Sequence, residues 1–528
     1  MRSDLKGMAL AATAGLLVAT VMTGCGAGGS DMGLSTADGG SAQQGLPGYP
    51  EPVDGGDEYA DWDEPIEGEA AIENGWVRVA DQPVSTFSSD VDTASYTLLR
   101  HLLNSEQWYD GMEDQIRIEE MINYFDYDYR APNAGAARPF NVDVKVGAAP
   151  WEPSHQLARI GVKAKEAREA TAGNNVVLLL DTSGSMGEPN KLPLLVESFK
   201  LLAQKFDDRD RVSIVTYAGS SEVLLDGVEG NATRQISKAL DSLQSGGSTA
   251  GSDGLKRAYN LAAENFIEDG NNRIILATDG DFNVGPSSVD ELETQITIAR
   301  ERGVFVSVFG FGMFSHDDMM ETIADNGNGN YFYIDSLAEA ERALVDQFDS
   351  TMFTVAKDLK LQVAFNPAEV ARYRLIGYEN RVLANEDFAD DAVDAGDVGA
   401  GSTVTALYEL VPGTAEAGDG DSGGVDSDYP DDGTWMTVAT RYKEPTGDES
   451  RQDDFQVPRS GASVQADDDW RFAAAVAEFG MILRHSENQG DASIDQVRSL
   501  ATGALGDDPY GLRAEFVELV GRYAASLR

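Results

Sequence analysis

The stretch "VVLLLDTSGSMG", Val176 to Gly187, decides the fold class of this chain. Its first five residues are all apolar, which is typical of a strand covered on both faces of a sheet. The run ends in Asp181, Ser183 and Ser185, whose side chains all carry oxygen. In open parallel sheets, ligands bind beyond the carboxyl ends of the strands. The stretch therefore predicts a buried parallel strand that ends at a polar site.

The surrounding sequence, from about residue 159 to residue 353, alternates strand-like and helix-like segments. Candidate strands are "LARIGVKA", "NVVLLLD", "RVSIVTYA", "SEVLLDGV", "RIILATDG" and "VFVSVFGFG". Between them, apolar residues recur at helical spacing, as in "KLPLLVESFKLLAQKF" and "GSDGLKRAYNLAAENF". This alternation predicts an α/β fold with a doubly wound, mostly parallel sheet.

Two more loops of this region carry oxygen side chains. "RIILATDG" ends a second buried strand with Asp279, and "GGSTAG" places Thr249 just before a helical segment. Because the carboxyl ends of parallel strands meet at one edge of a sheet, we expect both loops to share a site with Asp181. A shell of oxygens without His or Cys suits a hard cation such as Mg²⁺. Taken singly, each loop also fits a plain turn or a helix N-cap.

Together, the three loops resemble those of the von Willebrand factor type A (VWA) domain. "DTSGSMG" fits its D-x-S-x-S pattern, and "GGSTAG" and "ATDG" follow in the order and spacing of its other two loops. The resemblance implies a Rossmann-like VWA fold and a metal-ion-dependent adhesion site (MIDAS) for Mg²⁺, or another divalent cation such as Mn²⁺ or Ca²⁺. It also implies that an acidic side chain of a partner completes the coordination. The MIDAS residues would be Asp181, Ser183, Ser185, Thr249 and Asp279.

The flanks resemble those of a group of bacterial VWA lipoproteins, through "STFSSDVDTASYTLLRHLLN", "FNPAEVARYRLIGYENRVLANEDF" and "DPYGLRAEFVELV". We expect a small α+β flanking domain at residues 78–155 and the VWA domain at 156–354. A β-rich and helical flanking domain should follow at 355–528. Its acidic segment 414–433 lacks the register of an EF-hand and is interpreted as a solvated loop.

The first 25 residues have the pattern of a secretory signal peptide, with an apolar run that ends in small residues. Cys25, the single cysteine of the chain, follows this run and resembles the lipidated Cys of a bacterial lipobox. Ordinary signal cleavage beside an incidental Cys is the alternative. Residues 26–77 are rich in Gly, Ser, Asp and Glu, which predicts a disordered acidic tether. The chain is thus expected to be lipid-anchored and extracytoplasmic, in the cell envelope.

The charge balance restricts the class of partner. With 90 acidic and 40 basic residues, the chain carries a net charge of −50, which argues against nucleic acid as a partner. Neither the four His residues nor the loop after the strand has the spacing of a catalytic site or a P-loop, so no catalytic residue is assigned. We expect a non-enzymatic adhesion, scaffold or assembly protein. A metal-dependent hydrolase and a structural protein with an internally capped metal are the alternatives.

Overall fold

The computed structural model describes residues 72–89, 92–105, 108, 111–133, 135–166, 172–248, 251–280, 289–312, 317–393, 395–413, 433–445, 447, 449–461 and 464–527. The chain divides after Glu64, and all described residues belong to one unit, Pro65–Arg528. The described residues do not include Cys25, most of the expected tether, Thr249 or residues 414–432.

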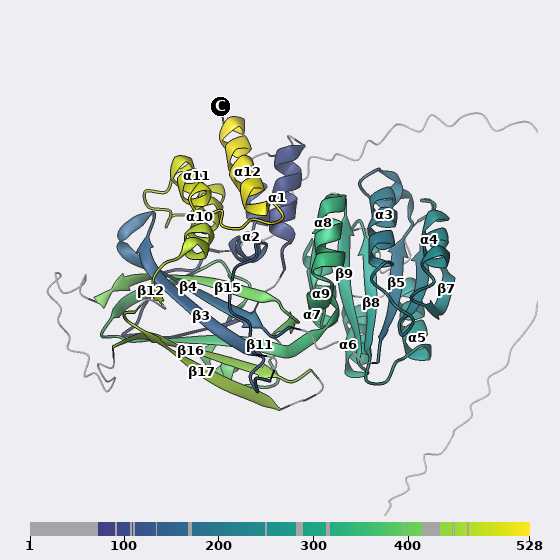
Figure 1. Ribbon diagram of the computed structural model, residues 1–528, viewed down its shortest axis with the longest axis horizontal. Helices are drawn as coiled ribbons and strands as arrows, with labels where there is room; N and C mark the ends of the chain where they lie inside the picture. The colour runs from purple at the N-terminus through teal and green to yellow at the C-terminus, as the bar shows by residue number, and fades with distance from the viewer. Residues whose placement is uncertain are drawn as a thin grey trace, which may run out of the picture. The chain divides into compact units, whose positions relative to one another are not determined.

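A six-stranded sheet forms the centre of the sequence, in the order β10-β9-β8-β5-β6-β7 (Figure 1). Its strands are parallel except β7, which runs antiparallel to β6. The prediction of a doubly wound, mostly parallel sheet is therefore confirmed. The strands are β5 (Asn174–Asp181), β6 (Arg211–Tyr217), β7 (Ser221–Glu229), β8 (Asn271–Thr278), β9 (Val304–Phe311) and β10 (Tyr331–Ile334).

Helices cover both faces of this sheet, as the apolar run of β5 predicts. Successive side chains of a strand point to opposite faces. Accordingly, Val176, Leu178 and Leu180 join one hydrophobic core, while Val177 and Leu179 join another. The first core is covered by α3 (Leu192–Leu202), α4 (Thr233–Asp241) and α8 (Leu337–Glu341), and the second by α5 (Gly251–Glu264), α6 (Val289–Glu301) and α7 (Asp317–Asn326). A π-helical turn, Arg342–Asp346, and α9 (Phe348–Met352) follow α8.

The two flanks of the central domain together build a β-sandwich. One sheet has the order β1-β12-β15-β4-β3, and the other β13-β2-β11-β16-β17, with β14 paired to β11. Each sheet contains strands from both sides of the central domain, so the flanks share one core instead of forming separate domains. The strands are β1 (Val77–Arg78), β2 (Val84–Ser88), β3 (Phe140–Ala149), β4 (Glu152–Ala164), β11 (Thr354–Phe365), β12 (Val370–Ile376), β13 (Val382–Leu383), β14 (Gly396–Gly399), β15 (Thr403–Pro412), β16 (Thr434–Lys443) and β17 (Ser450–Pro458).

The segment "LARIGVKA" lies in this sandwich and not, as its sequence suggests, in the central sheet. It forms most of β4, which pairs with β15 and β3. The pattern misleads because β4 is also covered on both faces. Ile160 and Val162 face the sandwich core, whereas Leu157 packs in a helical cluster on the outer face. Local apolarity reports that a strand is covered, but not which sheet contains it.

A helical layer packs on the outer face of the sheet that contains β4 (Figure 1). Aromatic side chains hold it together, with Phe125 against Phe472 and Phe516 at centroid distances of 4.8 and 5.7 Å. Among the described helices, none combines the length and apolarity needed to cross a bilayer. The layer consists of α1 (Ala94–Asn104), α2 (Ile118–Asn123), α10 (Asp468–Leu483), α11 (Ile494–Thr502) and α12 (Leu512–Ser526).

Candidate metal site

The two predicted carboxylates lie at the point where the strand order of the central sheet reverses. Asp181 is the last residue of β5, and Asp279 follows directly on β8. These strands are parallel neighbours, with Leu180 opposite Ala277, so they end at the same edge. The chain leaves β5 toward β6 on one side and leaves β8 toward β9 on the other. Such a switch point opens a crevice at the carboxyl ends of the strands.

The loop after β5 gathers three oxygen-bearing side chains. The Asp181 side chain is fully buried, and its Oδ1 accepts the Ser183 N–H at 2.8 Å. Its Oδ2 accepts the hydroxyl of Thr278, the last residue of β8, at 3.3 Å. The hydroxyl oxygens of Ser183 and Ser185 are 3.0 Å apart. Ser183 is buried and Ser185 half-buried, so the group reaches from the sheet to the surface.

Backbone hydrogen bonds bring the third predicted loop beside the first. The Gly184 N–H donates to the Gly247 carbonyl at 3.1 Å, and the Gly246 N–H donates to the Thr182 carbonyl at 2.8 Å. Gly247 has a φ of +86°, a region that favours glycine, and this lets the chain turn next to Gly184. The described part of this loop ends at residue 248. The position of Thr249 therefore stays a prediction.

The Asp279 carboxylate is buried, and its two oxygens are in different environments. Oδ2 accepts a hydrogen bond from the Lys191 ammonium at 3.1 Å. Oδ1 is buried and has no hydrogen-bond partner among the described residues. An unpartnered buried carboxylate oxygen is costly, and it commonly indicates a missing ion or water.

The electrostatics of the site are compatible with a bound cation. Burial raises the pKa of Asp181 to about 6, and the nearby Asp279 carboxylate adds to this increase, although hydrogen bonding from Ser183 opposes it. A bound cation would offset both the cost of burying the Asp181 charge and its repulsion by Asp279. Carboxylate and hydroxyl oxygens are ligands suited to Mg²⁺ and similar hard cations. Asp181, Ser183, Ser185 and Asp279 therefore fit such an ion.

The described residues contain no group of three or more His, Cys, Asp or Glu side chains able to hold a metal. Sequence reasoning missed Lys191, whose ammonium binds the Asp279 carboxylate. The only signal for Lys191 is that it is the single cation between the strand end and the helix in "DTSGSMGEPNKL".

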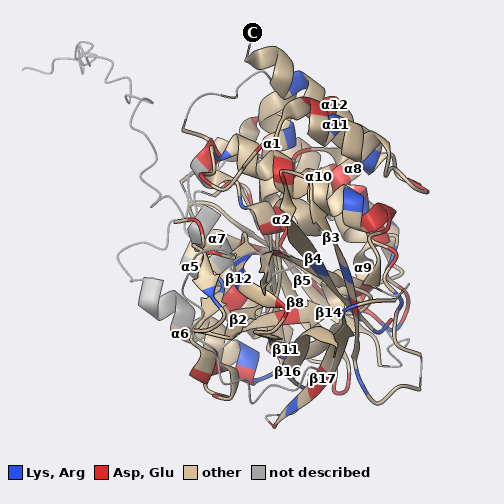
Figure 2. Ribbon diagram, turned by 90° about the vertical axis from the view of Figure 1, so that its left-hand side faces the viewer, with Lys and Arg blue, Asp and Glu red and all other residues tan. Residues whose placement is uncertain are grey.

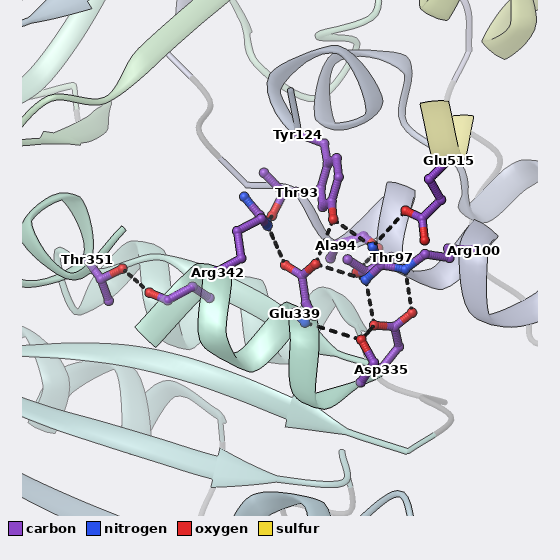
Figure 3. Close-up of polar contacts among 12 residues, drawn as sticks. Thr93, Ala94, Thr97, Arg100, Tyr124, Asp335, Glu339, Arg342, Thr351 and Glu515 are labelled. Carbon is purple, nitrogen blue, oxygen red and sulfur yellow. Dashed lines mark hydrogen bonds and ion pairs between the residues drawn. The ribbon is translucent and has the colours of Figure 1, made fainter. Parts of the chain in front are cut away.

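A second buried polar cluster joins the flanks to the central domain (Figure 3). Arg100 of α1 donates two hydrogen bonds to Asp335, at 2.7 and 2.6 Å, and Glu515 of α12 lies 3.2 Å from the same guanidinium. Asp335 directly follows β10, two strands away from β8, or about 10 Å along the sheet edge. The flanks therefore dock at the edge that carries the metal site. Among the described residues, however, the hydrogen-bond partners of the predicted ligands all belong to the central domain. These ligands are Asp181, Ser183, Ser185 and Asp279.

Family models match three parts of the chain. The von Willebrand factor type A domain matches residues 175–347. A model described as von Willebrand factor matches residues 67–159, and one described as uncharacterized protein YfbK, C-terminal, matches residues 350–526. The matches cover the central domain and both flanks.

Similar proteins extend over most of the chain. The Escherichia coli K12 protein YfbK is 42% identical over 457 residues, which cover 84% of this chain and 78% of YfbK. Among solved structures, a von Willebrand factor type A protein from Catenulispora acidiphila is 15% identical and covers 72% of this chain and 91% of that one, with a TM-score of 0.40. Proximal thread matrix protein 1 of the mussel byssus, solved with zinc in its MIDAS motif, is 22% identical over 35% of this chain and 46% of that one, with a TM-score of 0.29. The chain belongs to the family of bacterial von Willebrand factor type A domain proteins that includes YfbK.

Proposed function

We propose that this protein is a lipid-anchored protein of the cell envelope that binds a protein partner through a divalent cation. Asp181, Ser183, Ser185, Thr249 and Asp279 would hold the ion, and Mg²⁺ is the proposed occupant. Membership in the VWA family indicates a role in adhesion or protein interaction. The main observation in favour of cation binding is the Asp279 carboxylate near the buried Asp181 carboxylate. Its Oδ1 is buried and has no hydrogen-bond partner among the described residues.

The ligand chemistry favours capture of an external carboxylate. Hydroxyls of Ser183 and Ser185 are neutral, so a divalent cation that they help to bind keeps much of its positive charge. The cation supplies an electrostatic contact for an acidic side chain of the partner. Acidic positions recur along the described ribbon (Figure 2), in keeping with the net charge of −50. Away from the cation, this charge would repel an acidic partner.

Different groups of the chain orient the proposed ligands and hold their loops together. The Ser183 N–H and the Thr278 hydroxyl orient the two oxygens of Asp181. The backbone bonds between residues 184 and 247 and between residues 246 and 182 keep the first and third loops together. Ser185 is half-buried and Ser183 is buried, so Ser185 is the more exposed of these two hydroxyl ligands. No proton transfer or covalent step is assigned, so the proposed activity is binding alone.

Membrane attachment is proposed for Cys25, whose lipidation would place the folded unit outside the cytoplasm. The proposal rests on the signal-like residues 1–25 and on the acidic, Gly-rich segment that follows. One acyl chain gives only reversible membrane binding, whereas two or more anchor a protein firmly.

The decisive experiment is crosslinking of intact cells with either Mg²⁺ or EDTA present during the reaction, followed by capture of the protein. We expect a partner that is recovered with Mg²⁺, lost with EDTA and absent for the variant Asp181→Ala. Glu264→Gln, which removes an exposed charge elsewhere on the domain, is the matched control and should recover the partner normally. Equal recovery under all conditions would contradict the proposal.

A further inference from the structure

Lys191 places a positive charge directly against one of the proposed metal ligands. It precedes α3, and its ammonium lies 3.1 Å from the Asp279 Oδ2. The Lys191 side chain is 15% exposed and that of Asp279 is 1% exposed, so this ion pair is largely shielded from water. Shielding makes the pair stronger than an ion pair at the surface.

The path of the Lys191 side chain is built into the sheet edge. Its aliphatic carbons cross Gly312, the residue after β9, so closely that a Cβ on Gly312 would collide with them. Gly312 also has a φ of +87°, which favours glycine. Lys191 therefore reaches from the loop after β5, over the end of β9, to the end of β8. The absence of a side chain at Gly312 leaves room for the Lys191 side chain to pass.

The charge count shows what the ammonium does. Asp181 and Asp279 contribute two negative charges, and the hydroxyls of Ser183 and Ser185 contribute none. Lys191 offsets one of the two, so the site has a net charge of −1 before a cation binds. A divalent cation brings the net charge to +1. Without Lys191 the loaded site would be neutral.

We propose that Lys191 is an internal counter-ion that lowers the affinity of the site for its cation and keeps the loaded site positive for a carboxylate ligand. This inference rests on the proposed function. Because Lys191 binds Oδ2, it leaves Oδ1 of Asp279 as the oxygen available to the cation or to its bound water. Lys191 is thus a positioning and tuning residue, not a ligand.

The proposal predicts effects of opposite sign on the two binding steps. Replacing Lys191 with Met keeps most of the length of the side chain but removes its charge. Cation affinity should rise about tenfold, because the repulsion between the ammonium and the ion is lost. Binding of a carboxylate to the loaded site should fall, because the net charge drops from +1 to zero. A purely structural role for Lys191 would weaken both steps or change neither.

The test uses Mn²⁺ as the cation and acetate as the carboxylate. Free Mn²⁺ is measured by electron paramagnetic resonance during titration of the folded protein, and acetate binding by the relaxation of its methyl protons near bound Mn²⁺. The variants are Lys191→Met, Lys191→Arg, which keeps the charge, and Lys200→Met. Lys200 pairs with Glu197 on α3 at 2.9 Å and serves as the matched control for loss of a charge. Circular dichroism establishes that each variant is folded.

We expect tighter Mn²⁺ binding and weaker acetate relaxation for Lys191→Met, and values near those of the wild type for the other two variants. If the wild type binds Mn²⁺ but Lys191→Met binds it equally or more weakly, the role of Lys191 is overturned while the metal site stands. If the wild-type protein binds no Mn²⁺, the proposed function fails as well. A Lys191→Arg variant that behaves like Lys191→Met would show that charge is not the cause, and would also overturn the inference.

Discussion

The guanidinium of Arg100 lies 2.9 Å from the carboxylate of Glu339, and their side chains are only 7% and 1% exposed. This ion pair joins α1 of the N-terminal flank to α8 of the VWA domain (Figure 3). Burial by itself would raise the pKa of Glu339, but Arg342 and Arg100 overcome this effect and lower it. The Tyr124 hydroxyl donates to the same carboxylate at 2.7 Å. A buried polar cluster thus connects the N-terminal flank to the VWA domain, although the buried Nη1 of Arg342 has no hydrogen-bond partner among the described residues.

Removing Arg100 should strongly destabilise this junction. In the Arg100→Met variant, the buried carboxylates of Glu339 and Asp335 lose the positive charge of Arg100. Removing one partner of a buried ion pair costs about 3–5 kcal/mol of folding stability. Urea unfolding measures the loss. Arg78→Met is the control, because its pair with Asp81 has a separation of 3.9 Å and exposures of 63% and 71%, and such surface pairs contribute about 0–1 kcal/mol. Equal losses for both variants would contradict this assignment.

Glu478 of α10 should make the stability of the protein depend on pH. Burial raises its pKa to about 7, although the Ser493 N–H opposes this, and its Oε2 has no partner among the described residues. A raised carboxyl pKa means that the folded state favours the protonated form. Its stabilising contribution is therefore complete below about pH 4.5 and is lost as the pH rises through 7.

The variant Glu478→Gln tests this pH dependence. At pH 8 it should be more stable than the wild type, by up to about 3 kcal/mol, and at pH 4 the difference should vanish. Urea unfolding at a series of pH values provides the measurement. Glu518→Gln, on the exposed side of α12, should show no such trend. A constant difference between Glu478→Gln and wild type at all pH values would exclude titration of Glu478 as the cause.

Divalent cations should stabilise the folded protein. A ligand that binds only the native state adds about 2.7 kcal/mol at a concentration of 100 times its Kd. Mg²⁺ should therefore raise the melting temperature of the wild type in calorimetry. Asp279→Asn should abolish this increase, since it removes the unpartnered carboxylate oxygen. If Mg²⁺ raised the melting temperature of both proteins equally, the stabilising ion would bind at another site.

Attachment to a membrane should depend on Cys25. Each buried methylene of an acyl chain contributes about 0.8 kcal/mol, so loss of the chains should release the protein. We expect Cys25→Ser to lose incorporation of an alkyne-labelled fatty acid and to move from the membrane fraction to the soluble fraction. Ser30→Ala, in the adjacent segment, is the control. Fatty-acid labelling of the Cys25→Ser protein would refute lipidation at this residue.

Local sequence alone indicated the buried strands that carry the site and most of the side chains at their ends. The run before Asp181 predicts a doubly covered strand because burial on two faces leaves no polar position in the strand. The side chains of Ser183 and Ser185 follow that strand directly, so their place at the sheet edge comes from chain connectivity. Asp279 is predictable for the same reason, since it directly follows another apolar run, the one that forms β8.

Only the tertiary structure decided which strands share a sheet and which charge meets Asp279. "LARIGVKA" has the apolarity of a central strand, but its partners are β3 and β15, and pairing with β15 joins residues more than 200 positions apart, such as Val162 and Val404. The contact between Lys191 and Asp279 likewise spans 88 positions. Strand pairing and ion pairing depend on the surfaces that packing brings together, and periodicity in one segment carries no information about the distant partner.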